Sequence, residues 1–277
     1  MIKGITIGQY FAGRSPLHRM DARMKIVLTL AYMVVIFLCK NFWALGCTAL
    51  AAVLCAALSG VPAKMILRSM RPVLILVLFT GVLNVFYTNG PNTHIWFQYE
   101  LWRVTLKITR EGVFTAMFTT IRILCLIAVS SLLTYTTTPS MLTTAMERLL
   151  LPLAKLKVPV AVFAMMMTLA LRFVPTLIEE TERIMNAQKS RGANLETGSL
   201  LQRVRAFVPV LVPLFVSAFR RAAELASAME SRCYTGEGPR TSLKQLRLRP
   251  WDFGWLAGTV LLTAGIVALN HFFRAVI

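Results

Sequence analysis

Acidic residues and histidine are scarce in this sequence, which limits the chemistry it can support. Against 30 Lys and Arg there are 12 Asp and Glu, and the three histidines, His18, His94 and His271, are scattered along the chain. No Asp or Glu lies in the membrane-like stretches 26–39, 42–59, 73–88, 113–135 and 259–276. A membrane-embedded enzyme gathers carboxylates, histidine or a nucleophile near the membrane face. The sequence therefore argues against catalysis.

Paired cysteines and a nucleotide-binding loop are also missing. Four of the five cysteines fall inside apolar runs, and no CxxC occurs, so neither a disulfide framework nor a metal site is predicted. The phosphate-binding pattern G-x-x-x-x-G-K-[ST] is absent as well. We expect this chain to bind no cofactor, and any ATP that drives its function to be handled by other chains.

Apolar residues dominate what is present. Of the 277 residues 56% are hydrophobic and only 15% are charged, and the mean hydropathy is +0.64, which is too apolar for an ordinary soluble domain. The net charge of +18 does not indicate nucleic-acid binding, because the Lys and Arg cluster between apolar runs. In a membrane protein such an excess sets the topology and attracts anionic lipid headgroups.

The apolar runs predict an all-α membrane protein with about five transmembrane helices. Four runs precede residue 136, and the last begins near Trp251 and contains Thr259–Val276. We expect three regions: an N-terminal transmembrane region (1–135), a cytoplasmic-side region of amphipathic and other long helices (136–250) and a C-terminal transmembrane helix (251–277). Within the middle region, residues 141–157 are amphipathic and suit the membrane surface.

Two segments of the middle region are ambiguous, and the basic residues help to place them. The segment 158–178 has Arg172 as its only charge, whereas 206–219 is short and contains Pro209 and Pro213. If neither segment crosses the membrane, 24 Lys and Arg lie on one side of it and five lie on the other. The 24 belong to residues 1–25, to a basic loop at 60–72 and to the middle region. The positive-inside rule therefore favours this arrangement, with a cytoplasmic N-terminus.

Arg122 lies near the middle of the fourth predicted span. An ionisable residue at that depth normally faces the interior of the helix bundle. We favour a structural clamp on backbone carbonyls, and a role on a transport path is the alternative.

One short pattern occurs twice near the end of the middle region. Residues 187–192 and 228–233 share Ala-x-x-Ser-Arg, and their arginines, Arg191 and Arg232, lie 41 residues apart. Gly192 is a favoured left-handed helix end. Either arginine alone is typical of a solvated helix end, but two in the same setting of small residues indicate a pair of plugs that enter a partner's grooves, because arginine forms fork-like hydrogen bonds.

The same offset aligns complementary charges. Glu179 and Glu180 fall opposite Arg220 and Arg221, so two long helices could cross and pair there. Exposed pairs of this kind contribute only about 0–1 kcal/mol each.

Motifs spread over almost the whole chain carry a resemblance to a known family. They are Ser15-x-Leu17-His18-x-x-Asp21-x-Arg23-x-Lys25, Arg122, Thr136-Thr137-Thr138-Pro139, Arg172-Phe173-x-Pro175, Ala187-Gln188-x-Ser190-Arg191-Gly192 and Met229-Glu230-Ser231-Arg232. In these the sequence resembles the T component of energy-coupling factor transporters, ABC-type uptake systems for vitamins and metal ions. The central segment is most similar to T components shared among several substrate-binding subunits.

The resemblance implies a transmembrane scaffold with several partners. Its coupling helices would dock into grooves on two cytosolic ABC ATPase subunits, A and A', which hold ATP and Mg. A small membrane-embedded S component would capture the substrate and contact the apolar and amphipathic surface around 141–178. Movement of the coupling helices on ATP binding and hydrolysis would topple the S component.

By motif match, Arg191 and Arg232 would be the plugs. Their close-packing neighbours would be Ala187, Gln188, Ser190, Gly192, Ser231 and Cys233. Ser190 and Ser231 stand for Ala in the family pattern, a harmless change. Cys233 stands for Gly, which argues against a left-handed cap at the second tip.

Two other readings stay open. A permease subunit of a conventional ABC importer would line a substrate path itself, but one coupling element is usual there and this chain offers two. A membrane-embedded enzyme is the third reading and the least supported.

Overall fold

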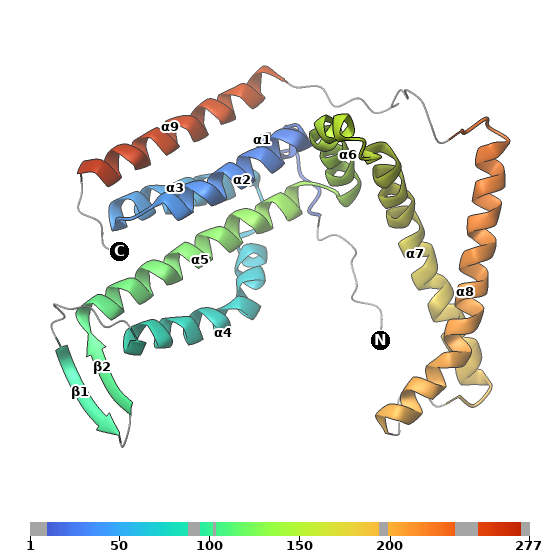
Figure 1. Cartoon of the computed structure of the whole chain (residues 1–277), viewed down its shortest axis with the longest axis horizontal. Coiled ribbons are helices and arrows are strands. Elements are labelled where there is room, and N and C mark those ends of the chain that lie inside the picture. Colours follow the sequence, from blue (N-terminus) through green and yellow to red (C-terminus); the bar gives the residue numbers. More distant parts are fainter. Residues whose placement is uncertain (1–9, 88–94, 102–103, 194–198, 236–248, 273–277) are drawn as a thin grey trace. The chain divides into compact units, whose positions relative to one another are not determined.

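The computed structural model describes residues 10–87, 95–101, 104–193, 199–235 and 249–272 (Figure 1). The described chain divides into two compact units. One holds residues 10–145 together with 249–272, and the other holds residues 146–235.

The first unit is a bundle of long helices with one short β-hairpin. In chain order its elements are α1 (Pro16–Arg19), α2 (Ala22–Leu38), α3 (Phe42–Ser59), α4 (Ala63–Tyr87), β1 (Ile95–Leu101), β2 (Val104–Thr109), α5 (Arg110–Thr136), α6 (Pro139–Leu150), which continues into the second unit, and α9 (Pro250–Phe272). The membrane fold is all-α, as predicted.

Local sequence signals set the ends of these helices. The Asp21 side chain accepts a hydrogen bond from the Arg23 backbone N–H at 2.9 Å and caps α2. Thr109 caps α5 in the same way, through the backbone N–H of Gly112. Gly60 ends α3 with a φ of 68°, a conformation that glycine adopts without strain.

The core of this unit lies where α2, α3, α5 and α9 meet. Phe118 of α5 is fully buried and packs with Val35 of α2, Leu45 of α3 and Ile266 of α9. Helix α5 packs against α2, α3 and α4, whereas α9 packs against α2 and α3. The C-terminal helix therefore closes the bundle that the N-terminal helices begin.

The basic loop predicted at 60–72 is largely helical, which corrects the sequence analysis. Helix α4 begins at Ala63 and carries Pro72 inside it, and Figure 1 shows the helix bent. Proline removes one backbone hydrogen bond and kinks a helix, but an apolar helix packed on a neighbour continues past it. Lys64, Arg68 and Arg71 therefore lie on the first turns of α4.

The hairpin between α4 and α5 was not predicted. Strands β1 and β2 pair antiparallel, from Ile95 opposite Thr109 to Leu101 opposite Val104.

The second unit is built on two helices of 31 residues. Its elements are the 3₁₀ helix η1 (Leu151–Leu156), α7 (Val160–Ser190) and α8 (Leu200–Glu230). Ser199 and Gln202 form a capping box at the start of α8. Both helices run through internal prolines, Pro175 in α7 and Pro209 and Pro213 in α8, so they extend well beyond 158–178 and 206–219.

Six described helices are long and apolar enough to cross a membrane, judged by length and composition: α3, α4, α5, α7, α8 and α9. This count differs from the five predicted spans. It includes α7 and α8, whereas α2, at 17 residues, lies at the short end for a bilayer span. The protein is a multi-pass membrane protein.

Candidate functional site

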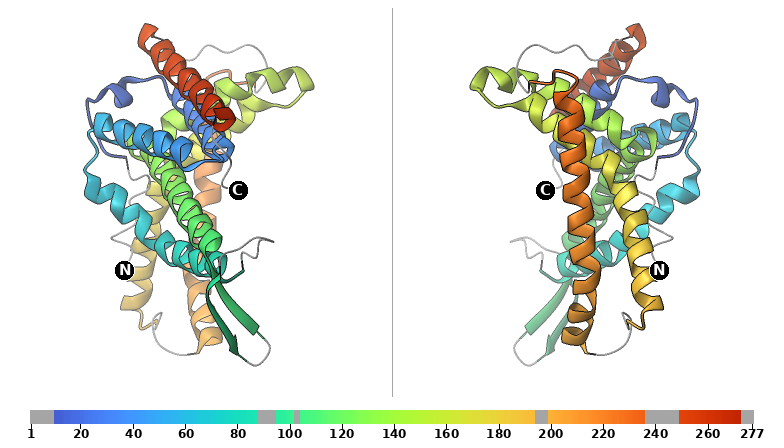
Figure 2. Two further views of the ribbon diagram at one scale, coloured as in Figure 1. Left: turned by 90° about the vertical axis from the view of Figure 1, so that its left-hand side faces the viewer. Right: turned by 90° about the vertical axis from the view of Figure 1, so that its right-hand side faces the viewer.

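Helices α7 and α8 run side by side in opposite directions, as Figures 1 and 2 show. Three contacts join them at separate levels. At one end, the Tyr234 hydroxyl lies 2.8 Å from Met165 Sδ. In the middle, Arg221 pairs with Glu180. At the other end, the Gln188 side-chain amide donates to the Pro209 carbonyl. Residue numbers rise along one helix while they fall along the other, so the pair is antiparallel.

The middle contact is an ion pair between aligned charges. Arg221 Nη2 lies 3.0 Å from Glu180 Oε2, and the two side chains are 31% and 21% exposed. Glu179 and Arg220, aligned in the same way, are exposed and form no ion pair among the described residues. Adjacent residues point about 100° apart on a helix, so both pairs cannot face the same interface.

A double-mutant cycle on Glu180 and Arg221 should measure this pair. We expect Glu180→Gln and Arg221→Gln to show a coupling energy of about 0.5–1 kcal/mol in denaturation of the detergent-solubilised protein, because the pair is only partly shielded from water. Glu179→Gln with Arg220→Gln is the matched control and should show none. Equal coupling in the two cycles would contradict the observed pairing.

Gln188 joins the first tip to a carbonyl that proline leaves free. Pro213 has no N–H, so the carbonyl of Pro209, four residues earlier, loses its helical donor. The Gln188 side-chain amide donates to this carbonyl at 3.3 Å. The prolines of α8 therefore create an acceptor that holds the end of α7.

The first tip ends in a Schellman motif. The backbone N–H of Ala193 donates to Gln188 and that of Gly192 donates to Lys189, each at 3.0 Å, and Gly192 has a φ of 85°. Ser190 returns its hydroxyl to the Asn186 carbonyl at 3.1 Å. Ala187 and Arg191 are exposed. The guanidinium therefore projects from a rigid turn of small residues.

The second tip has the same backbone, contrary to expectation. The N–H of Tyr234 donates to Met229 at 3.0 Å, the N–H of Cys233 donates to Glu230 at 2.9 Å, and Cys233 has a φ of 59°. Cys233 thus adopts the left-handed conformation that its non-glycine identity argued against. Two hydrogen bonds offset the strain, which costs about 1–2 kcal/mol for an L-residue. Arg232 is exposed, and Ser231 Oγ donates to Ala228 at 3.1 Å.

Cys233→Gly should stabilise the second tip. Glycine removes the left-handed strain but adds flexibility to the unfolded chain, so we expect a net gain of about 0.5–1 kcal/mol. Slower hydrogen exchange of the amides at 229–234 would report it. Cys47→Gly, at an exposed position inside α3, is the control: glycine destabilises a helix interior, so hydrogen exchange of the neighbouring α3 amides should become faster. Faster exchange at the tip of Cys233→Gly would contradict the assignment.

The two arginines lie at opposite ends of the helix pair. Arg191 follows the contact at Gln188, whereas Arg232 lies near the contact at Met165. At 1.5 Å per residue the two levels are on the order of 35 Å apart along α7. The helix pair therefore presents one exposed arginine at each end, and a guanidinium group suits hydrogen bonds to carboxylates or carbonyls.

Arg122 contacts a backbone carbonyl and an aromatic ring inside the other unit. Its Nη2 donates to the carbonyl of Cys39 at 2.7 Å, and its guanidinium lies 4.6 Å from the centre of the Phe118 ring. Cys39 caps α2, where the last carbonyls lack helical donors. The guanidinium therefore joins the end of α2 to α5.

The structure brings two of the family-like motifs together. Lys25 is buried, and its Nζ donates to the Thr136 carbonyl at 2.9 Å and to Thr137 Oγ1 at 3.3 Å. In the same N-terminal motif, His18 Nε2 lies 2.8 Å from the carbonyl oxygen of Phe11. These motif residues therefore tie the start of α2 to the end of α5.

Sequence reasoning missed the two outer contacts of the helix pair. Tyr234 and Met165 carry no pattern that predicts their meeting. The four-residue spacing of Pro209 and Pro213 signals a free carbonyl, but not that Gln188 would find it. Both contacts depend on the antiparallel direction of α7 and α8, which the sequence does not give.

Comparisons with known proteins agree with one another. The family profile of CbiQ, described as cobalt transport protein, matches residues 13–243, a range that includes Arg122 and both tips. The chain is 46% identical over 273 residues to the energy-coupling factor transporter transmembrane protein EcfT of Ruminiclostridium cellulolyticum, covering 99% of this chain and 100% of the relative. It is 40% identical over 276 residues to the protein of the same name from Bacillus subtilis, covering 99% and 100%.

Proposed function

The chain belongs to the CbiQ family of cobalt transport proteins, as a transmembrane component of energy-coupling factor transporters, and on this premise we propose that it couples two cytosolic ABC ATPase subunits to a substrate-binding S component. The transported compounds would be vitamins or other micronutrients. The S component would recognise them, and one copy of this chain would serve several S components.

One observation carries the proposal: the chain has two tips of the same chemistry at opposite ends of one helix pair. Arg191 and Arg232 each leave a Schellman turn among small residues. Two ATPase subunits present two like grooves, so each tip would enter one of them. Arginine suits such a groove, because its fork binds carboxylates and carbonyls with fixed geometry.

ATP and Mg would be bound by the ATPase subunits. Their closure and opening would move the tips, and the contacts of Glu180 with Arg221 and of Gln188 with Pro209 would make α7 and α8 respond as one body. The excess of Lys and Arg around the tips supports a cytoplasmic position for them and for the N-terminus.

The S component would rest on the apolar side of this helix pair. A groove of about 470 Å³ runs between α7 and α8, and its lining includes Leu169, Phe173, Leu225 and Tyr234. The groove overlaps the surface around 141–178 that the resemblance implies. Exposed apolar grooves of this kind suit a membrane-embedded partner.

Co-purification tests this function. The chain, tagged and expressed with its neighbouring genes, should bring down two ABC ATPases and a small hydrophobic membrane protein in mild detergent. In the Phe173→Asp variant the amount of co-purified S component should fall at least about tenfold, because the substitution places a charge in the groove. The amount of co-purified ATPases should stay unchanged. Recovery of the chain alone, or with a conventional permease, would contradict the proposal.

A further inference from the structure

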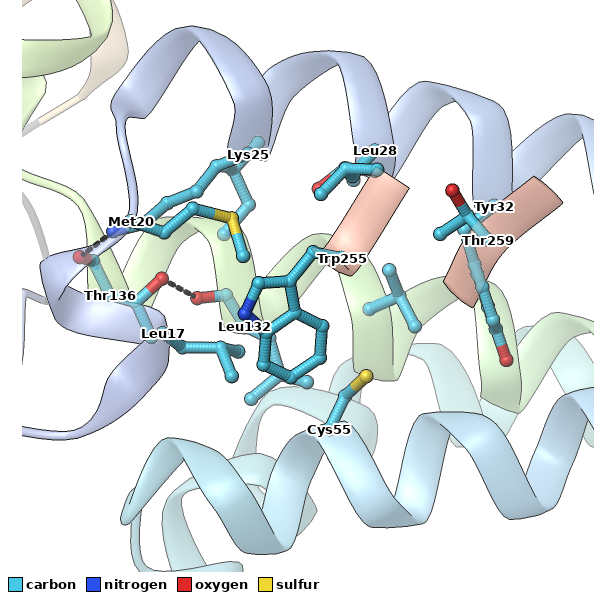
Figure 3. A pocket seen from close by; sticks show the side chains of 13 residues that line it. Leu17, Met20, Lys25, Leu28, Tyr32, Cys55, Leu132, Thr136, Trp255 and Thr259 are labelled. Carbon is cyan, nitrogen blue, oxygen red and sulfur yellow. Dashed lines mark hydrogen bonds between the residues drawn. The ribbon is translucent and has the colours of Figure 1, made fainter. Parts of the chain in front are cut away.

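Two neighbouring cavities of the first unit form one cleft at the ends of its helices. The first is an apolar slot of about 100 Å³ whose lining includes Leu17, Leu28 and Leu132 (Figure 3). The second is a wider cup of about 330 Å³. Met20 and Trp255 line both. We call the slot and the cup together the arginine cleft. The slot is its apolar half, and the cup is its charged half.

The charged half is strongly basic. Arg14, Arg19 and Arg249 line the cup, and their guanidinium groups form no ion pair within the described part of the chain. The one carboxylate in the lining, Asp252, is 1% exposed and accepts a hydrogen bond from the Arg249 backbone N–H at 2.9 Å. Asp252 is buried at the start of α9, so the cup presents three exposed cations against one buried carboxylate.

The position of the cleft is that of a membrane interface. It lies where α2 and α9 begin and α5 ends, so apolar helices extend from it on one side only. Trp251, which is 81% exposed, and Trp255 belong to the cup, and tryptophan is enriched at headgroup level. Lys25 reaches the slot, but its ammonium group is engaged by Thr136 and Thr137. The slot therefore offers apolar contact below a cationic rim.

We propose that the arginine cleft binds one anionic phospholipid, with the phosphate among the three arginines and an acyl chain along the slot. A free phosphate would use only the cup and leave the apolar slot unfilled. A zwitterionic lipid would bring its own cation against the arginines. An anionic phospholipid matches both the cup and the slot, and such lipids are common in cytoplasmic leaflets.

Native mass spectrometry of the full-length chain with dioleoyl phosphatidylglycerol or dioleoyl phosphatidylcholine tests this site. We expect retention of phosphatidylglycerol over phosphatidylcholine. Each arginine should contribute about fivefold, the equivalent of about 1 kcal/mol per basic residue near an anionic headgroup. Arg14→Gln, Arg19→Gln and Arg249→Gln together should therefore weaken binding on the order of a hundredfold.

A matched control removes the same charge elsewhere. Lys64→Gln, Arg68→Gln and Arg71→Gln, on α4, should leave retention of phosphatidylglycerol close to that of the unmodified chain. Equal losses in both triple variants would overturn the proposal, because they would show a general effect of net charge. Equal retention of the two lipids by the unmodified chain would overturn it as well.

Two further arms address the slot. Thr259→Phe, which fills the slot and leaves the arginines in place, should lower retention of the diacyl lipid at least about tenfold, by loss of buried methylene contacts. Glycerophosphoglycerol, the headgroup without chains, should not displace the lipid at a hundredfold excess. Unchanged retention in Thr259→Phe, or displacement by the free headgroup, would show that no acyl chain is held and would overturn the proposal.

Discussion

Replacing Arg191 and Arg232 together with glutamate is expected to release the ATPase subunits and to stop uptake. Each substitution removes a forked cation from a groove and puts a carboxylate in its place. Truncating one partner of a buried charged contact costs about 2–5 kcal/mol, so we expect ATPase association to fall by a hundredfold or more. Co-purification from detergent and uptake in cells measure the two effects.

The matched control reverses two arginines elsewhere on the same helices. Arg183 on α7 and Arg220 on α8 are exposed and lie away from the tips. Arg183→Glu with Arg220→Glu changes the net charge equally and should weaken ATPase association far less than the tip variant does, because each exposed charge contributes at most about 1 kcal/mol, or about fivefold. Normal uptake in the tip variant, or equal loss in both variants, would contradict the plug hypothesis.

Arg122→Met is expected to destabilise the transmembrane bundle rather than to change transport selectively. The variant loses a charged hydrogen bond to the carbonyl of Cys39 and the contact with the Phe118 ring. Together these contribute about 2–3 kcal/mol, which corresponds to a fall in apparent Tm of about 5–10 °C. Fluorescence-detected size-exclusion chromatography after heating measures it.

Arg68→Met, at an exposed position on α4, is the control and should shift Tm by less than about 2 °C. An unchanged Tm in Arg122→Met together with lost uptake would instead place Arg122 on a transport path. That is the alternative that the sequence left open.

The repeated pattern in the sequence predicted one contact of the helix pair and missed its direction. An alignment at constant offset places Glu180 opposite Arg221, and the structure joins them. An antiparallel pair can satisfy such an offset at only one level, because residue numbers fall along one helix as they rise along the other. The contacts of Gln188 and of Tyr234 therefore could not follow from the alignment.

Prolines and the second tip explain most of the remaining differences. Pro72, Pro175, Pro209 and Pro213 all lie inside helices, although the sequence favoured breaks or short segments around most of them. Tertiary packing and a side-chain donor such as Gln188 offset the lost hydrogen bonds. At Cys233 two backbone hydrogen bonds outweigh a local preference. Contacts between helices decided the fate of the prolines, and local backbone hydrogen bonds decided the second tip; composition shows neither.

Site-specific photocrosslinking tests the central claim most directly. A photoreactive benzoylphenylalanine would replace Ser190 in one variant and Ser231 in another, at equivalent positions beside the two arginines. Because the tips lie at opposite ends of the helix pair, we predict that each variant crosslinks to an ATPase subunit, and that the two crosslink to different copies. Crosslinks from both positions to one copy, or to no ATPase at all, would contradict the account.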